Sequence, residues 1–286
     1  MNPVSNKPFN SIPSPVLPCL INNFFPVQNA KNLLKRSIVL IVFSTLIHFS
    51  YSQTTDTNKS VSHFSGTASV TNNGISLIPT ITLGKPALIF DLSMGKRFSF
   101  DPLLRFALAG KPWSFVFWWR YKLVNTGKFR FNIGMHPSLS FKTIPVISNG
   151  VSNDIIRTQR HLAGELYPYY LITNRISAGV YYMYIYGVET EDVRHTHFLT
   201  LNMTFSDIRL SDQFYMKFNP QVYLLKMDKN HGYYYTATLF LAKRKFPLSV
   251  SGLINKAFQT SVPNSSGLVW SLSLVYSFNQ QFVKIQ

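Results

Sequence analysis

The alternation of residues 268–278 constrains the fold of this chain more than any other feature. This stretch reads LVWSLSLVYSF, so every second side chain is large and apolar, and those between are valine or serine. Because successive side chains of a β-strand point to opposite faces, this period of two predicts a strand with one apolar and one wettable face. The apolar face ends in two aromatic residues close to the C-terminus, Tyr276 and Phe278.

Similar alternation recurs along the chain, with turn residues between the segments. Twelve segments show it, and we expect each to form a strand: 75–83, 86–94, 97–108, 113–123, 128–142, 160–171, 176–186, 197–206, 213–225, 233–242, 248–259 and 268–278. Bacterial barrels made of one chain have an even number of antiparallel strands, and twelve fits this rule. Residues 64–71 alternate poorly, but the turn 72–74 (Asn-Asn-Gly) could pair them with the next segment, which would extend the first strand or change the count.

The lengths of the connections favour the same fold. If both termini lie in the periplasm, the odd-numbered connections face outward and should be the longer ones. The fifth connection, residues 147–156, is long and polar, whereas the fourth (125–127) and the sixth (173–175) are tight turns. This parity is expected of a barrel made of successive hairpins.

The chain resembles bacterial outer-membrane β-barrel proteins, porin-like proteins included, over nearly its whole mature length. The residues that carry the resemblance are the alternating segments and the closing strand, whose aromatic end matches the girdle at a lipid interface. The resemblance implies an all-β, antiparallel, up-and-down transmembrane barrel of about twelve strands. It also implies contact with outer-membrane lipid and lipopolysaccharide, and assembly by the barrel-assembly machinery through the C-terminal strand. One departure is that the chain continues past Phe278 to Gln286, with Phe282 as a second terminal aromatic residue.

Composition agrees with a lipid-facing surface. Only 14% of the residues are charged, well under the roughly 25% of ordinary soluble domains. No apolar run reaches the roughly 18 to 20 residues of a membrane-spanning helix. The alternative is a soluble β-sandwich or a lipocalin-like barrel, whose apolar face would point inward. The aromatic content of 15% and the closing strand favour the membrane barrel.

The N-terminal segment has the three parts of a secretory signal peptide. Basic residues at 31, 35 and 36 precede the apolar core 37–47, and Ser50-Tyr51-Ser52 offers a cleavage site. We therefore expect a leader and signal peptide over 1–52, a periplasmic segment over 53–74 and the barrel over 75–286, in the outer membrane of a Gram-negative cell. A start codon assigned too far upstream would account for residues 1–30. The single cysteine, Cys19, precedes the cleavage site, so the mature protein should lack disulfides.

The charge of the mature chain is strongly positive. The formal net charge is +17, and residues 1–52 hold four bases and no acids, so the remainder carries 24 − 11 = +13. A surplus of this kind can indicate a nucleic-acid partner. Here the bases are dispersed through strands and turns, so we expect no nucleic acid. An acidic outer leaflet or an anion-attracting lumen explains them.

Alternation also predicts which side chains point into the barrel. A charge that faces lipid at mid-bilayer costs about 2–4 kcal/mol, so charges within strands should point inward. The charged residues expected to line the lumen are Asp91, Arg105, Arg120, Arg130, Glu165 and Lys217. Four bases against two acids could form an electropositive constriction that favours anions. Alternatively, they pair with one another and fill a narrow lumen.

Aromatic residues follow the same sorting. Trp113 and Trp119 share the face expected to meet lipid, opposite Arg120. Six tyrosines are expected to point inward: Tyr167, Tyr169, Tyr181, Tyr215, Tyr223 and Tyr234. Such residues can form a slide for sugars or other flat solutes, or simply fill a narrow barrel.

Two histidine motifs are candidates for chemical sites. His136 and Ser138 resemble the His-x-Ser pair of the outer-membrane phospholipase family, but here they are expected on the inner face and no third residue orients the imidazole. His195 and His197 lie near two acids of the seventh connection and could hold a metal, but two histidines on one strand are better explained as part of a solvated barrel end. We therefore assign no catalytic residue, metal or cofactor.

These observations support three functions from different classes. The first is a passive channel for small solutes, with anions preferred in a basic lumen, and not an enzyme. The second is a structural or surface-interaction barrel with a plugged lumen. The third is a lipid-modifying outer-membrane enzyme that uses His136 and Ser138.

Overall fold

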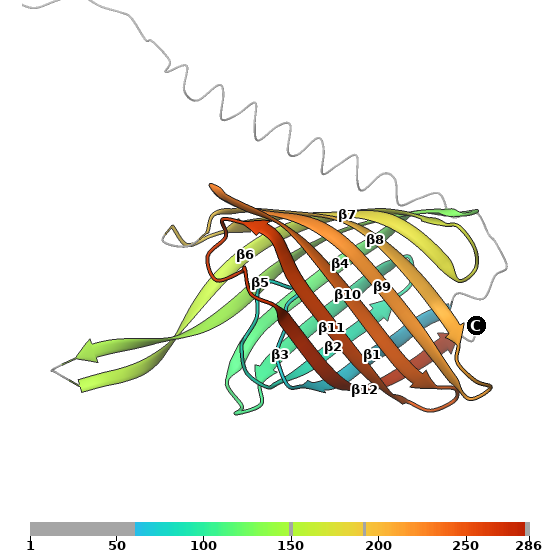
Figure 1. Cartoon of the computed structure of the whole chain (residues 1–286), viewed down its shortest axis with the longest axis horizontal. Helices are drawn as coiled ribbons and strands as arrows, with labels where there is room; N and C mark the ends of the chain where they lie inside the picture. Colours follow the sequence, from blue (N-terminus) through green and yellow to red (C-terminus); the bar gives the residue numbers. More distant parts are fainter. Residues whose placement is uncertain (1–60, 149–150, 191–192, 284–286) are drawn as a thin grey trace, which may run out of the picture. The chain divides into compact units, whose positions relative to one another are not determined.

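The chain forms a closed barrel of antiparallel strands. The computed structural model describes residues 61–148, 151–190 and 193–283. Within them, twelve strands pair each with its neighbours in sequence, and β1 pairs with β12 to close the barrel (Figure 1). The all-β, antiparallel, up-and-down architecture and the count of twelve are therefore confirmed. No helix among the described residues is long and apolar enough to cross a membrane.

The strands are long and joined in simple order. Their bounds are β1 Val61–Thr71, β2 Ala87–Gly95, β3 Phe98–Ala107, β4 Pro112–Thr126, β5 Phe129–Ser148, β6 Val151–Leu171, β7 Ile176–Gly187, β8 His195–Arg209, β9 Phe214–Met227, β10 Asn230–Lys243, β11 Leu248–Thr260 and β12 Val269–Val283. Val61 and Val283 are paired at one end of the barrel, which we call the terminal end. We call the opposite end the hairpin end, because the β5–β6 hairpin extends beyond the barrel there (Figure 1).

The prediction that the first strand covers 75–83 is wrong. The first strand is β1, whose residue Thr71 pairs with Ser273 of β12 and with Ala87 of β2. The barrel therefore begins at Val61 and takes in much of the segment expected to be periplasmic. The alternation of β1 is weak because small residues fill it, and closure of the barrel on β12 supplies its pairing.

Two further parts of the chain, the fifth connection and the closing strand, differ from the prediction. The fifth connection is not a long loop, because β5 and β6 continue through most of it as a paired ladder from Ser148 and Val151 inward. The closing strand does not end at Phe278 but runs on to Val283. Both differences arise because backbone pairing continues where the side-chain pattern no longer predicts it.

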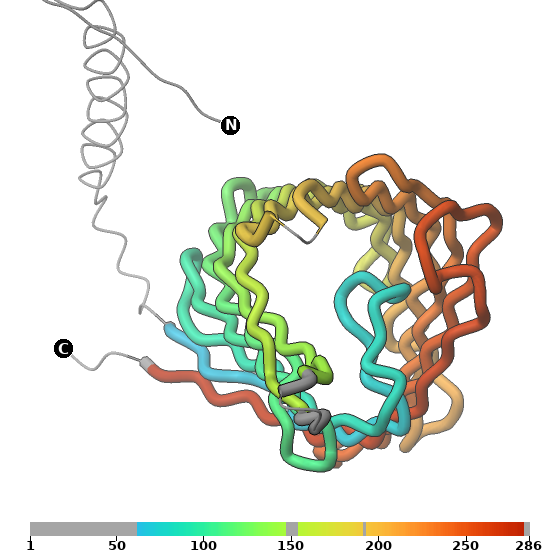
Figure 2. The backbone as a smooth tube through the Cα atoms, turned by 90° about the vertical axis from the view of Figure 1, so that its left-hand side faces the viewer, coloured from blue at the N-terminus to red at the C-terminus, as the bar shows by residue number. Residues whose placement is uncertain are grey.

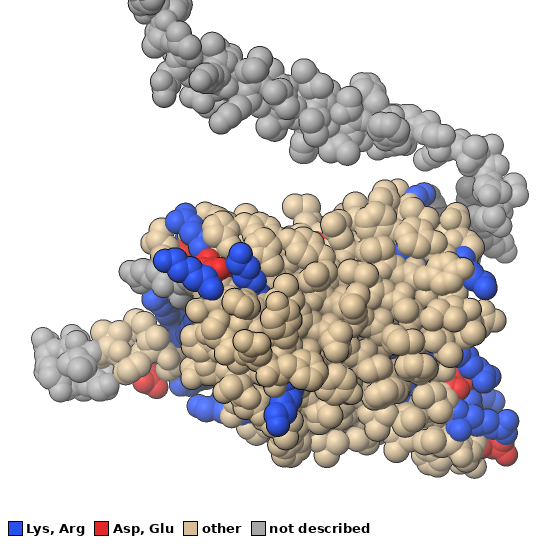
Figure 3. Space-filling model, turned by 45° about the horizontal axis from the view of Figure 1, so that its top comes forward, with Lys and Arg blue, Asp and Glu red and all other residues tan. Residues whose placement is uncertain are grey.

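The two faces of the strands sort by polarity as the sequence predicts. On β8, Phe198 and Thr200 point inward and are each 2% exposed. The next residue, Leu201, points outward and is 57% exposed. Leu272 and Leu274 of β12 are likewise exposed on the outside. Figure 3 shows charged side chains gathered toward the ends of the visible face, with an almost uncharged middle. An apolar band of this extent fits a barrel that spans a membrane with its outer face in lipid.

Trp113 is the exception to this sorting. It was expected to face lipid, but it is buried, and its ring lies beside Gly74 and Arg105. The pairing of β3 with β4 shifts register between Arg105 and Phe106, next to Trp113. A register shift re-aims the side chains beyond it, so simple alternation fails for this end of β4.

Asp228 joins two connections at the hairpin end. Its carboxylate, in the β9–β10 turn, accepts hydrogen bonds from the backbone N–H groups of Arg194 (3.0 Å) and His195 (2.8 Å). These donors favour the charged form and hold the pKa of Asp228 below its usual value of 3.8.

This shift predicts a pH dependence. Because the folded pKa is depressed, the stabilisation from Asp228 is present above the unfolded pKa and is lost as the pH falls through the folded pKa. Asp228→Asn should therefore lower the unfolding temperature of the barrel at neutral pH, and lower it less at about pH 2. The measurement is the midpoint of heat-modifiable gel migration across this pH range. A difference that stays constant with pH would contradict the role of the carboxylate.

Candidate functional site: the barrel lumen

The connection between β1 and β2 folds into the barrel instead of crossing its rim. Residues 72–86 leave β1 at the hairpin end and lie inside the ring of strands (Figure 2). The backbone N–H of Gly74 donates to the carbonyl of Lys85 at 2.9 Å, and an isolated bridge joins Ile75 to Thr82. We call this segment the inserted hairpin. It occupies the place where the sequence predicted a wall strand.

The tip of the inserted hairpin is held against the inner wall. Ile78 is 2% exposed, and the neighbouring Pro79 is buried too. Ile78 shares a hydrophobic cluster with inward side chains of six strands: Trp118, Ala163, Met183, Phe198, Tyr223, Leu225 and Tyr234. Because burial removes these apolar surfaces from water, the cluster fixes the tip inside the lumen. The hairpin therefore narrows the passage from one side.

Arg120 is the centre of the charged part of the lumen. Its Nε donates to Glu165 Oε1 at 2.6 Å, and its Nη1 donates to Asp101 Oδ2 at 3.1 Å. The Tyr181 hydroxyl donates to Glu165 Oε2 at 2.6 Å, and the guanidinium lies 4.3 Å from the Trp118 ring centroid. One cation thus holds two buried carboxylates on the wall and is stacked on an aromatic ring.

The hydrogen bonds continue from this centre to the first strand. The Ser93 and Ser99 hydroxyls donate to the two carboxylate oxygens of Asp101, at 2.6 and 3.2 Å. His63 Nε2 lies 3.0 Å from the Ser93 hydroxyl oxygen and completes the series. The result is an unbroken chain of polar contacts from β1 to β7, which we call the polar track.

Gly134 allows the polar track to cross β5. In the strand register Gly134 lies opposite Arg120 on one side and Glu165 on the other. A Cβ at this position would lie 2.7 Å from Glu165 Oε1 and 3.1 Å from Arg120 Cγ. These approaches are too close for a side chain, so the ion pair passes over β5 because this residue is glycine.

Two of the other charges predicted for the lumen lie close to the polar track. Asp91 faces inward and is exposed to the lumen, within the electrostatic reach of Arg120 and Arg105. Arg105 is buried, donates through Nη1 to the Ser114 hydroxyl at 3.2 Å, and lies over the Trp113 ring at 5.4 Å. Four of the six predicted charges, Asp91 and Arg105 among them, therefore lie in one region of the wall.

Arg130 and Lys217 lie elsewhere. Arg130 turns back at the terminal end, where its Nη1 donates to the backbone carbonyls of Gly127 (2.6 Å) and Phe129 (3.1 Å). Lys217 of β9 lies 5.8 Å from the ring centroid of Phe240 on β10. Neither of these two cations joins the ion pairs of the polar track.

Four members of the polar track were not predicted from the sequence: His63, Ser93, Ser99 and Asp101. Asp101 lies four residues before Arg105 on the same strand, so the alternation that placed Arg105 inward could have placed Asp101 there too. His63 could not be found because its strand was not recognised. With Asp101 included, the charges in this region are three acids and two bases, and Arg120 pairs with Asp101 and Glu165.

Aromatic rings line the other part of the wall. Ring centroids are 5.7 Å apart from Tyr167 to Tyr181, 6.1 Å from Tyr181 to Phe198, 5.1 Å from Phe198 to Tyr223 and 4.8 Å from Tyr223 to Tyr234. These distances fit aromatic contact, and the rings span β6 to β10. We call this series the aromatic arc. The predicted inward orientation of its four tyrosines is confirmed, and Phe198 was missed.

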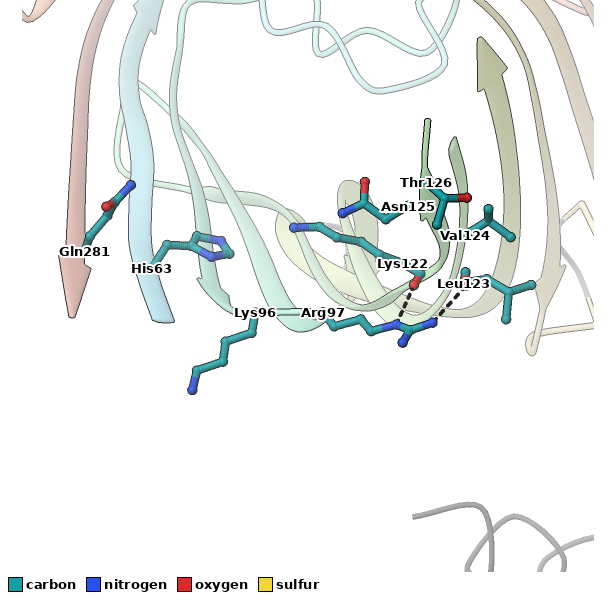
Figure 4. A pocket seen from close by; sticks show the side chains of 9 residues that line it. All are labelled: His63, Lys96, Arg97, Lys122, Leu123, Val124, Asn125, Thr126 and Gln281. Atoms are coloured by element: carbon teal, nitrogen blue, oxygen red, sulfur yellow. Dashed lines mark hydrogen bonds between the residues drawn. The ribbon is translucent and has the colours of Figure 1, made fainter. Parts of the chain in front are cut away.

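A cavity of about 630 Å³ lies inside the terminal end. In Figure 4, the side chains of His63, Lys122 and Gln281 point into it, whereas the Arg97 guanidinium is held by the backbone carbonyls of Lys122 and Leu123 at 3.0 Å each. The full lining is His63, Lys96, Arg97, Lys122, Leu123, Val124, Asn125, Thr126 and Gln281. This set has three cations and no acid.

The geometry does not assemble a nucleophilic pair from His136 and Ser138. Both are buried on the inner face, as predicted. The His136 ring packs on Trp118, with centroids 4.0 Å apart, and its Nδ1 has no hydrogen-bond partner among the described residues. A catalytic serine needs a histidine that is itself oriented by a third group. The described lumen does not provide that group.

The second pair of histidines lies on the outer face of the barrel. His195 Nδ1 bonds to the Tyr184 hydroxyl at 2.7 Å and His197 Nδ1 to the Tyr182 hydroxyl at 2.9 Å. In the described ranges, no group of three or more His, Cys, Asp or Glu side chains is placed to hold a metal ion. The acids of the seventh connection at 191 and 192 lie outside those ranges.

Comparisons with known proteins give distant likenesses only. No protein-family model matches the sequence, and no curated protein matches it. Among solved structures, the KdgM porin matches with 9% identity and a TM-score of 0.46, over 76% of this chain and 99% of that one. The NanC porin matches with 12% identity and a TM-score of 0.45, over 77% and 100%. An outer-membrane channel of Pseudomonas putida F1 matches with 10% identity and a TM-score of 0.41, over 82% and 98%.

The assignment of the fold does not depend on these likenesses. It depends on the strand pairing, on the apolar outer surface and on the polar lining of the lumen. These features identify the chain as a closed, antiparallel β-barrel of twelve strands with an apolar outer face.

Proposed function

We propose that this barrel is a passive channel for small solutes, with a preference for anions set at its terminal mouth. The observation that carries the proposal is the cavity inside the terminal end, with three cations, a histidine and no acid in its lining. A barrel that serves only as a structural element needs no such mouth. The inserted hairpin and the polar track then set the width and polarity of the passage.

The proposal includes a location and an orientation. An exported protein with this outer surface resides in the outer membrane of a Gram-negative cell. In this arrangement the terminal end faces the periplasm, as is usual for such barrels, and the β5–β6 hairpin extends to the outside. Residues 1–52, which would provide the signal peptide, lie outside the described part of the chain.

A plugged barrel is the second candidate, and the inserted hairpin favours it. Ile78 and its cluster fill part of the lumen, and Arg120 is engaged by two carboxylates rather than left to meet a solute. In this case the protein would act through its outer loops. No comparable observation on the described residues favours the lipid-modifying enzyme.

Planar-bilayer recording across a KCl gradient tests both candidates, with the processed protein purified from membranes. A channel should give steady conductance steps, with a reversal potential displaced toward the chloride equilibrium potential. Lys122→Gln should reduce that displacement because it removes a cation from the mouth. Lys229→Gln, at a turn of the hairpin end, is the control and should leave it unchanged. Silence from folded, heat-modifiable protein would instead support the plugged barrel, and a cation-selective potential would contradict the anion preference.

A further inference from the structure

A band of cations and rings lies on the outer face at the hairpin end. The strand register places Tyr184 opposite His197, His197 opposite Lys226, and Lys226 opposite His231. These side chains point away from the lumen, because they share the outward positions of Leu199, whereas Phe198 points inward. This row crosses β7, β8, β9 and β10. We call its residues, together with Tyr186, Arg194 and His195 beside them, the band.

Hydrogen bonds leave several donors of this band available. The tyrosine hydroxyls occupy Nδ1 of His195 and His197, and neither Nε2 bonds to a described residue. Arg194 is held by the Tyr186 hydroxyl, at 2.9 Å from Nη2 and 3.3 Å from Nε, and stays exposed. Lys226 is exposed, and its ammonium makes no ion pair with any residue in the described ranges.

The two acids that the structure describes near the band, Asp228 and Glu189, already accept hydrogen bonds. Asp228 accepts the backbone N–H groups of Arg194 and His195. Glu189 accepts from the backbone N–H and from Nε of Arg160, each at 2.8 Å. The described surface of the band therefore offers mainly donors, which suits a ligand that carries negative charge.

An apolar groove lies on β5 to β10, farther from the hairpin end than the band on β8 and β9. It has a volume of about 550 Å³ and exists because small or cyclic residues, Ala178, Pro168 and Pro220, leave space between larger neighbours. Leu201 and Val222 line it side by side on β8 and β9. Leu201 follows His197 by four residues, a distance of about 13 Å along the strand. One acyl chain can span this distance and extend into the groove.

We propose that the band and the groove together bind one anionic lipid of the outer leaflet, a phosphorylated glycolipid of the lipid A type. Its phosphate contacts Lys226, Arg194 and the Nε2 atoms of the histidines, and an acyl chain lies in the groove. The choice of leaflet rests on the orientation proposed above, since the hairpin end then meets the outer leaflet. The choice of lipid rests on charge complementarity and on the combination of a donor-rich head site with an apolar groove.

Native mass spectrometry of the detergent-purified barrel, titrated separately with lipid A, phosphatidylglycerol and phosphatidylcholine, tests the proposal. We expect lipid A to bind tightest. Lys226→Gln should weaken lipid A binding roughly tenfold, through loss of a charge-assisted contact. The matched control is Lys243→Gln. Lys243 is an exposed lysine at the terminal end of β10, far from the band, and the variant should bind as wild type does.

A second pair of variants, one a control for the other, tests the groove. Val222 lines the groove and Val250 of β11 does not, and both are 43% exposed on the outer face. Val222→Trp should weaken lipid A binding by filling the groove, whereas Val250→Trp should not. Heat-modifiable migration and single-channel conductance, unchanged in each variant, show that the barrel is folded.

Three outcomes would overturn the proposal. Equal binding of all three lipids would mean that there is no head-group site. Phosphatidylglycerol bound as tightly as lipid A would contradict the glycolipid assignment. Equal effects of the two lysine variants, or of the two tryptophan variants, would show that the band or the groove does not form the site. A channel that conducts normally in all variants leaves the proposed function intact, so the two proposals fail separately.

Discussion

Replacing residues 76–82 of the inserted hairpin with an Asn-Gly turn should raise single-channel conductance at least about twofold, because the tip leaves the passage that it narrows. The deletion removes Ile78 and Pro79 from the lumen, and the base of the hairpin at Gly74 and Lys85 is kept. The measurement is conductance in a planar bilayer at symmetrical salt. Unchanged conductance would mean that the narrowest point lies elsewhere.

A point variant at Ile78 tests whether its buried side chain holds the inserted hairpin in place, without shortening the hairpin. Ile78→Asp places a charge among Phe198, Tyr223 and Tyr234, where an unpaired carboxylate is strongly disfavoured. The tip should leave the wall, and the recordings should show larger and noisier openings. Leu77→Asp is the matched control, since Leu77 is the adjacent residue and is 43% exposed. If both variants behave alike, added charge rather than lost anchoring explains the change.

Gly134→Val should break the polar track at the ion pair between Arg120 and Glu165. The Glu165 side chain is 3% exposed, so loss of its partner leaves a buried charge without compensation. Breaking a buried pair typically costs about 3–5 kcal/mol, and we expect a destabilisation of that order in urea unfolding of the barrel. Gly164→Val is the control, because a Cβ there meets nothing closer than the Gly134 carbonyl oxygen at 3.9 Å. A similar loss in both variants would reflect strand propensity alone.

Glu165→Gln tests the electrostatic role of the same pair without adding bulk. It removes one of the three acids near Arg120 and Arg105, so the local charge becomes more positive. The reversal potential in a KCl gradient should move further toward the chloride equilibrium potential. An unchanged reversal potential would mean that permeating ions do not sense this region, and a shift in the opposite direction would contradict the prediction.

Much of the wall could be predicted because local patterning and barrel geometry agree there. Leu201 faces lipid and its neighbour Thr200 faces the lumen. The barrel therefore requires an alternation of apolar and polar residues, and the sequence has this alternation. The aromatic arc was predicted for the same reason, since each of its tyrosines lies on a strand with clear alternation. Trp113 shows where this reasoning fails, because a register shift next to it reverses the face.

Side-chain patterning could not predict the partners of the charged residues. The sequence places Arg120 and Glu165 on the inner face, but they lie on strands separated by β5. Their contact depends on a glycine at the one facing position of that strand. Arg130 was assigned to the same lumen, yet it bonds to the carbonyls of its own turn. Alternation predicts which face of a strand a side chain lies on. The position of that side chain along and around the barrel depends on the register of the paired strands.

The sequence by itself determined the fold class, eleven of the twelve strands, the lipid-facing surface and most of the inward residues, because each depends on a local period of two. Only the tertiary structure decided which segment closes the barrel and which folds into it. Residues 75–83 alternate as a strand would, but β1 takes the place beside β12, and Ile78 is buried against the wall instead. Closure is a contact between the two ends of the chain, and no local pattern can encode which segment will make it.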